Sequence, residues 1–271
     1  MGKGLTICAM VVLVLVAVNT ARAGPYAASA SEQNDVTVSG SWTSVGHYLS
    51  DQCDSWVGNP ALWDLDSQVE GSSPVDLSTN ISDSYGSAST SITVNVPGGV
   101  PTISIDSDAE VHDVQPGPGG TFNEHWAMGY SNGGANWMQS TANQTVDFTV
   151  DYSYVLDLLD AAPHQATAEV RICVGFWDAS HVLGLSADSE WQFVEDGDSD
   201  HLCKTVTLTS IGSSVTSGAL SKTWQVSVTE NAWHSFWSHG EAYAHTAAIP
   251  EPATMLLAGA GLLALLFRRK R

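Results

Sequence analysis

The chain has 271 residues, with 9 basic residues against 29 acidic ones and a formal net charge of −20. Six of the basic residues lie near the two ends, so residues 24–249 carry three basic and 28 acidic residues, a net charge of −25. A body with so few cations cannot neutralise a phosphate backbone, which excludes nucleic acid as a partner. A hydrophobic fraction of 43% with only 14% charged residues favours a packed core over disorder.

The first 23 residues have the pattern of a secretory signal peptide. Lys3 precedes an uncharged apolar run over residues 5–18, and Ala21 and Ala23 place small residues at the two positions that signal peptidase recognises. We expect cleavage before Gly24, with an uncleaved N-terminal anchor as the alternative. Residues 24–35 are predicted to form a flexible leader.

Residues 36–249 alternate between apolar and polar positions, which is typical of strands with one buried face. The longest alternating runs cover residues 146–156 and 166–176. Clusters rich in Gly, Pro, Asn and Ser separate the runs, and a helix-like pattern is confined to residues 155–162. Residues 50–90 have weak periodicity and are expected to be long loops or a loosely ordered stretch. The pattern predicts an all-β fold, a single antiparallel β-sandwich of jelly-roll type over residues 36–249.

Three cysteines remain after the predicted cleavage: Cys53, Cys173 and Cys203. An exported protein permits disulfide formation. Cys173 and Cys203 lie in strand patterns of the same half of the chain, so we expect them to pair and leave Cys53 over. Three cysteines without a C-x-x-C spacing do not indicate a zinc site.

Two short motifs have a structural and a chemical interpretation. Residues 129–133 match the G-x-S-x-G nucleophile elbow, with Ser131 at its centre, but no helix pattern follows, so a turn is the favoured interpretation. Asp196, Asp198 and Asp200 alternate in an acidic segment that can hold Ca²⁺, yet the EF-hand spacing is not met. A structural Ca²⁺ ion is therefore a hypothesis beside a solvated acidic turn, and no other cofactor is expected.

The chain has ten tryptophans, seven of them after residue 125. Trp191 and Trp224 are in phase with buried positions and are expected in the core. Trp233 and Trp237 are out of clean phase, so they are candidates for exposed rings that stack on sugars. No acidic pair identifies itself as the catalytic pair of a glycosidase.

The C-terminus combines Pro250, Glu251 and Pro252 with a 15-residue apolar run and a basic stop, Arg268, Arg269, Lys270 and Arg271. The two prolines keep the chain extended before the run. As a helix the run would be about 22 Å long, marginal for a bilayer core of about 30 Å, with the four cations on the cytoplasmic side. Residues 250–271 are therefore predicted to anchor an exported protein in a membrane.

This ordered set of features, together with the signal peptide, resembles the PEP-CTERM sorting signal. The resemblance implies processing by an exosortase-type enzyme in a Gram-negative bacterium, with an inner-membrane-anchored intermediate and delivery to the cell surface or extracellular matrix. It also implies an association with exopolysaccharide. An ordinary tail anchor is the alternative.

We therefore expect a non-enzymatic surface or matrix protein with a structural or adhesive role. A carbohydrate-binding module that uses exposed tryptophans is the second hypothesis. The third is a secreted hydrolase, which would need a pocket that joins a His, a carboxylate and a nucleophile.

Overall fold

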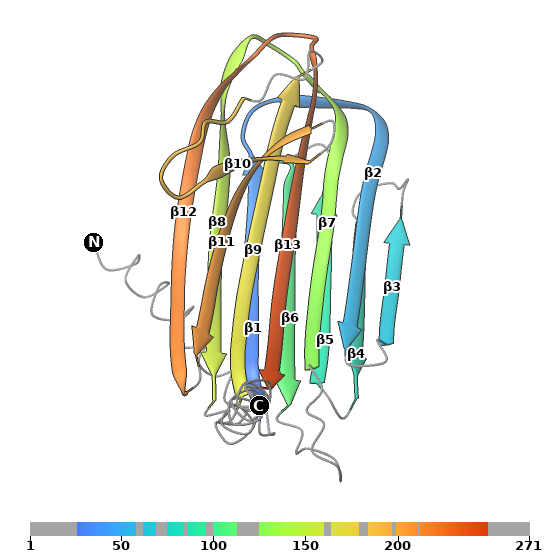
Figure 1. The fold of residues 1–271 in the computed structure, drawn as a ribbon. Helices are drawn as coiled ribbons and strands as arrows, with labels where there is room; N and C mark the ends of the chain where they lie inside the picture. Colours follow the sequence, from blue (N-terminus) through green and yellow to red (C-terminus); the bar gives the residue numbers. More distant parts are fainter. Residues whose placement is uncertain are drawn as a thin grey trace, which may run out of the picture.

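The computed structural model describes residues 26–57, 62–68, 75–83, 86–95, 100–112, 125–159, 164–178, 184–196, 199–210 and 212–248. These residues form thirteen strands (Figure 1). Their bounds are β1 Tyr26–Val38, β2 Trp42–Val57, β3 Leu62–Gln68, β4 Val75–Ser82, β5 Gly86–Asn95, β6 Thr102–His112, β7 His125–Ser140, β8 Gln144–Leu158, β9 His164–Asp178, β10 Gln192–Asp196, β11 Ser199–Ser210, β12 Ser214–Val228 and β13 Trp233–Ala248.

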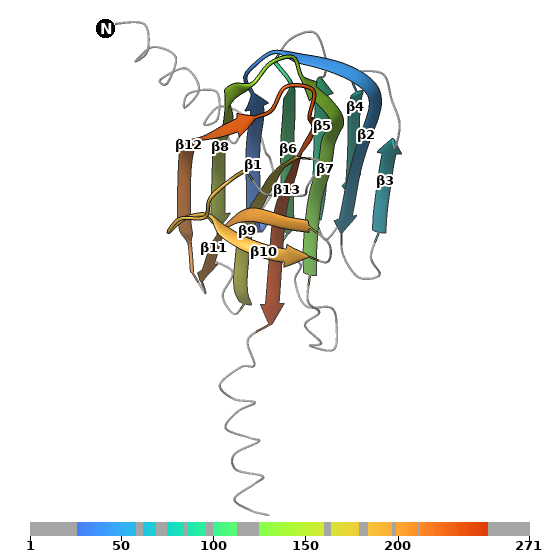
Figure 2. The same ribbon diagram turned by 90° about the horizontal axis from the view of Figure 1, so that it is seen from above.

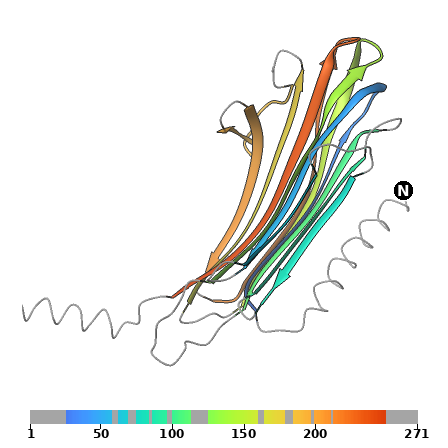
Figure 3. The same ribbon diagram turned by 90° about the vertical axis from the view of Figure 1, so that its right-hand side faces the viewer.

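The strands form two sheets that pack face to face, so the predicted β-sandwich is confirmed. Sheet A has six strands in the order β12-β8-β1-β6-β5-β4, and sheet B has seven in the order β10-β11-β9-β13-β7-β2-β3. Figures 2 and 3 show the two layers from above and from the side. The long strands of both layers curve in the same direction. Neighbouring strands in both sheets run antiparallel.

The core follows directly from the period-2 pattern of the sequence. In β8 the alternate residues Val146, Phe148 and Val150 are fully buried, whereas Asp147 and Asp151 are exposed. On the facing sheet, Phe176 of β9 and Phe236 of β13 are buried, and the ring of Phe176 lies 5.7 Å from that of Phe148. Antiparallel sheets that bury one face give this alternation.

The predicted flexible leader over residues 24–35 is wrong. Residues 26–38 form β1, a central strand of sheet A that pairs with β6 on one side and β8 on the other. Before Val36 its inward residues are small or polar rather than large and apolar, with Ala28, Ala30, Glu32 and Asn34 all buried. That composition hides the strand from a search for hydrophobic alternation.

Two further local expectations are corrected. Residues 155–158, the start of the helix-like segment, complete β8 and pair with β1 and β12. Most of the described residues between 50 and 90 belong to strands β2, β3, β4 and β5, not to long loops. Tertiary pairing overrides weak local propensity in both places.

A polar cluster lies inside the sandwich, between the two sheets. Asn34 donates a hydrogen bond to Glu32 at 3.1 Å, and Ser238 of β13 donates one to Asn34 at 3.1 Å. Ser107 also hydrogen-bonds Glu32, and burial raises the pKa of the Glu32 carboxyl to about 8. A Cβ at position 240 would overlap the Glu32 carboxylate, so Gly240 leaves the room that this carboxyl fills. Glu32 is therefore held as a neutral acid at pH 7.

The segment before β10 closes one side of the sandwich. Trp191 is fully buried, and its ring packs edge-on against Trp224 of β12 with centroids 5.4 Å apart. Trp224 donates to the carbonyl of Ser186 at 3.0 Å, and the Lys222 ammonium pairs with Asp188 and holds the pKa of that carboxyl at about 2. The core positions that the sequence assigns to Trp191 and Trp224 agree with this packing.

Candidate functional site

The outer faces of the two sheets differ sharply in chemistry. The outward positions of sheet A carry mostly Ser, Thr, Asn and Asp, and none of those that the structure describes is Lys or Arg. Its aspartates are Asp35, Asp76, Asp106, Asp108, Asp147, Asp151 and Asp157. The outer face of sheet B instead gathers aromatic and histidine side chains.

Strand β13 lies at the centre of that second face. Phe236, Ser238 and Ala242 point into the core and are fully buried. The alternate residues, which include Trp237 and His239, are half-buried on the opposite face. The side-chain alternation of a strand therefore places these rings on the outside of sheet B.

Two glycines border Trp237 on its neighbouring strands. Trp237 is in register with Gly175 of β9 on one side and with Gly134 of β7 on the other. A Cβ at position 175 would overlap the ring of Trp177. The side chains beside Trp237 are thus reduced to hydrogen at both positions, which lets large rings lie across the sheet.

The rings meet over Gly175. Trp237 stacks on His201 of β11 with centroids 4.5 Å apart, and Trp177 lies edge-on to His201 at 5.5 Å. His239 lies nearly parallel to Trp237 at 5.9 Å, and Tyr130 of β7 lies 5.7 Å from His239. We call these five side chains, Tyr130, Trp177, His201, Trp237 and His239, the aromatic platform.

The platform combines apolar ring faces with hydrogen-bonding groups. Imidazole nitrogens, indole N–H groups and a phenol can donate or accept beside the flat rings. Arg171 of β9 lies directly opposite Glu241 of β13, while Asp178 follows Trp177 and Asp200 precedes His201 in the chain. The platform is therefore a cluster of aromatic and imidazole rings on the outer face of sheet B of a strongly acidic protein.

Trp233 and Trp237, the two candidates for sugar stacking, occupy the same face of β13. Trp237 is at the centre of the platform, whereas Trp233 lies four residues away, about 13 Å along the strand. The sequence did not predict Gly175 or the other four platform residues, Tyr130, Trp177, His201 and His239, as parts of a site. One feature of the sequence points to Gly175. It is a glycine at an outward position of a regularly alternating strand, two residues before Trp177.

The structure joins Cys173 and Cys203, the pair expected from the sequence. They are opposite residues of β9 and β11 with Cα atoms 4.1 Å apart. The bond fastens the strand that carries His201 to the strand that carries Gly175 and Trp177. The disulfide therefore supports one side of the platform.

Ser131 is not a nucleophile on an elbow. It lies within strand β7, is fully buried, and hydrogen-bonds Thr90 of β5 at 2.6 Å. Thr90 also bonds Ser107 at 2.9 Å, so Ser131 belongs to the interior polar cluster. The turn favoured for this segment is also wrong, because residues 129–133 continue the strand.

The calcium hypothesis stays a prediction. Asp196 ends β10 and Asp200 lies in β11, while Asp198 is outside the described residues. Among the side chains that the structure describes, no group of three His, Cys, Asp or Glu residues is arranged to hold a metal ion.

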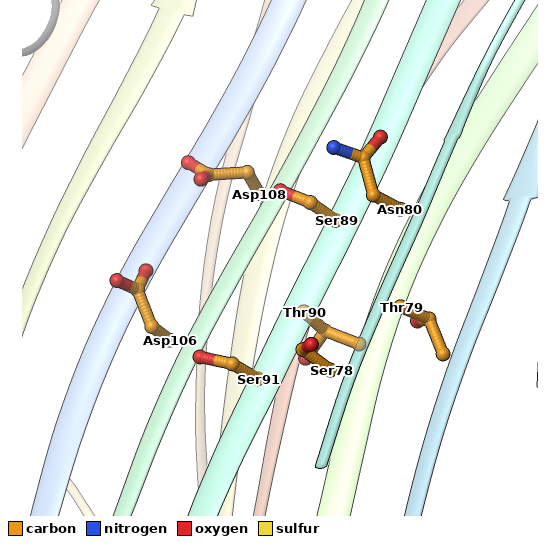
Figure 4. Close-up of a pocket in the computed structure, with 8 residues that line it drawn as sticks. All are labelled: Ser78, Thr79, Asn80, Ser89, Thr90, Ser91, Asp106 and Asp108. Carbon is orange, nitrogen blue, oxygen red and sulfur yellow. The ribbon is translucent and has the colours of Figure 1, made fainter. Parts of the chain in front are cut away.

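A shallow groove of about 300 Å³ lies on the outer face of sheet A. Ser89 stands between Asp108 and Asn80, and Ser91 between Asp106 and Ser78, in two rows across β6, β5 and β4 (Figure 4). Thr79 and Thr90 complete its lining. All of its lining residues are Ser, Thr, Asn or Asp, whereas most small-molecule pockets are lined mainly by hydrophobic and aromatic side chains.

Comparison with protein-family models matches residues 248–271 to the PEP-CTERM protein-sorting motif. The predicted resemblance is confirmed, and the match contains Pro250, Glu251, Pro252 and the four terminal basic residues. No match was found among curated proteins or among solved structures. The chain carries a sorting signal that indicates an exosortase-processed, extracellular protein with a membrane-anchored intermediate.

The two terminal signals lie outside the described residues, both the signal peptide with Ala21 and Ala23 and the sorting segment over residues 250–271. Within the part of the chain that is described, no helix is long and apolar enough to cross a bilayer.

Proposed function

We propose that this protein is a non-enzymatic adhesive component of the bacterial cell surface or extracellular matrix, and that its aromatic platform binds polysaccharide. The observation that carries the proposal is the position of Trp237, which lies between two glycines and stacks with His201. Flat rings of this kind fit the apolar faces of sugar rings, and the polar tips beside them fit sugar hydroxyls.

The charge of the protein narrows the class of polysaccharide. Residues 24–249 carry a net charge of −25, and the outer face of sheet A bears aspartates without a cation among its described outward positions. A polyanionic polymer would be repelled as it approached such a protein at low salt. We therefore propose neutral polysaccharide chains as the ligands of the platform.

The sorting signal supports this role, because an exosortase-processed protein is delivered outside the cell. Exopolysaccharide is the proposed partner there. A non-catalytic adhesin needs only a binding surface. The platform lies on an outer sheet face, which suits a polymer that runs across the strands rather than a substrate enclosed in a pocket.

Co-sedimentation with insoluble neutral polysaccharides and with the exopolysaccharide of the producing cell tests the proposal. We expect the exported protein to pellet with at least one of them, and Trp237→Ala to weaken retention at least tenfold. Trp233→Ala, which removes the same side chain on the same face outside the platform, is the matched control and should bind normally. If Trp237→Ala is retained on the polysaccharide as well as the wild-type protein, the platform is not the binding site.

The same incubation tests the absence of catalysis. We expect no new reducing ends in the polysaccharide after prolonged contact with the protein. If reducing ends accumulate in proportion to protein concentration, the protein is a secreted hydrolase and the non-enzymatic adhesive role is wrong.

A further inference from the structure

Strand β12 differs from the other edge strands of the sandwich. It forms one edge of sheet A and pairs along all fifteen of its residues, 214–228, with β8 alone, without a register shift. The side of β12 away from β8 has no strand partner in the described residues. An edge of this length presents a row of backbone N–H and C=O groups that can accept another strand.

Proteins normally protect such edges with short strands, bulges or charges. The other three edges follow this rule. Strand β10 has five residues and contains Glu195 and Asp196, and β3 has seven and contains Asp64 and Asp66. Strand β4 has eight residues and contains Asp76.

Strand β12 is long and has no bulge, and its one charged residue, Lys222, is paired with Asp188. The side chains on its outer face are uncharged: Val215, Ser217, Ala219, Ser221, Thr223, Gln225 and Ser227. Val215 is 66% exposed although it is apolar.

The charge of the protein decides which strand fits this edge. Two copies with a net charge of −25 over residues 24–249 repel one another, and β3, β4 and β10 would each bring carboxylates together. Strand β12 contains no carboxylate, so it is the edge at which two copies meet with least repulsion. A two-fold axis also produces the antiparallel pairing that extends an antiparallel sheet.

We propose that β12 pairs antiparallel with β12 of a second copy of this chain, joining two six-stranded sheets A into one continuous sheet. With the two-fold axis at Ser221, Ala219 of each copy lies opposite Thr223 of the other. The dimer carries two aromatic platforms, but its formation does not depend on what they bind.

Sedimentation equilibrium of the exported protein tests the proposal. We expect a dimer at micromolar concentration for the wild-type protein. Ala219→Lys combined with Thr223→Lys places like charges directly opposite across the two-fold axis, and should weaken dimerisation at least tenfold. Ser31→Lys combined with Thr37→Lys adds the same charge to the same face on the interior strand β1, and should leave the dimer intact.

Oxidative cross-linking fixes the register. Ser221→Cys, on the proposed axis, should give a covalent dimer under mild oxidation, whereas Ser31→Cys should not. The circular dichroism spectrum and melting temperature of each variant report whether it is folded. A monomeric wild-type protein, or a folded β12 double-lysine variant with an unchanged dissociation constant, would overturn the proposal.

Discussion

Trp237 and His201 stack with ring centroids 4.5 Å apart although strand β9 lies between their two strands. Side chains two strands apart are normally separated by the side chain between them, since neighbouring strands are about 4.8 Å apart. Gly175 of β9, in register with Trp237, supplies no such side chain. The platform therefore depends on a residue that contributes no atom beyond its backbone.

Gly175→Ala is expected to disrupt the platform without unfolding the protein. The added methyl group would overlap the ring of Trp177, which must then move away from His201. We predict a loss of polysaccharide affinity of about tenfold, measured by affinity electrophoresis, with a stability change within about 1 kcal/mol because alanine is no worse than glycine in a strand. Gly212→Ala is the control, because a Cβ there meets nothing within 4 Å. Equal affinity for both variants would contradict this account of Gly175.

Glu32 should make the fold less stable as the pH rises. Its folded pKa is about 8, above the usual 4.5. Between these values the unfolded chain has lost the Glu32 proton while the folded protein retains it, so the stabilisation is complete below pH 4.5 and is lost by about pH 8. The slope is at most about 1.4 kcal/mol per pH unit.

Glu32→Gln keeps the shape and removes this titration. We expect its free energy of unfolding to vary less between pH 5 and pH 8 than that of the wild-type protein, in urea titrations at each pH. Asp35→Asn, on the outward face of the same strand, should retain the wild-type profile. Parallel pH profiles for the wild type and Glu32→Gln would show that the carboxyl is not held neutral.

The disulfide should stabilise the fold by restricting the unfolded chain. Cys173 and Cys203 are 30 residues apart in sequence, and closing a loop of that size contributes about 3–4 kcal/mol. The Cys173→Ser, Cys203→Ser double variant should lose that amount in urea unfolding, and dithiothreitol should have no further effect on it. A double variant as stable as the oxidised wild type would mean that strand pairing alone fixes β9 against β11.

The sorting motif makes a prediction about location. Replacing both Pro250 and Pro252 with alanine should leave export intact but block exosortase processing, so the protein should accumulate in the membrane fraction. Immunoblots of membrane and culture-medium fractions measure this. Pro101→Ala, outside the matched residues 248–271, is the control. Normal release of the double alanine variant would show that processing does not use this motif.

The fold class was predictable because β8 and β9 alternate large apolar and polar residues over long runs, the clearest signal a sequence offers. The first part of strand β1 was missed because polar residues such as Glu32 and Asn34 are typical of a flexible leader. Their burial is explained by the facing residues Gly240 and Ser238 of β13.

The candidate site was predictable only in part. Trp237 was a candidate because it is out of phase with the apolar alternation of the buried positions. His201 and Gly175 join it only through the order β11-β9-β13, and which strands become neighbours depends on long-range pairing that local periodicity does not contain. For the same reason, the sequence made Cys173 and Cys203 a plausible pair, while their opposite positions on β9 and β11 come from the register.

The central claim is that one platform, built on Trp237 over Gly175, binds polysaccharide. A double-mutant cycle by calorimetric titration of a soluble polysaccharide fragment tests it most directly, with Trp237→Ala, Gly175→Ala and the double variant. If both residues act through the same platform, Trp237→Ala should lose at least tenfold in affinity, and adding Gly175→Ala should cost little more. Affinity that survives in Trp237→Ala, or losses that simply add in the double variant, would contradict the account.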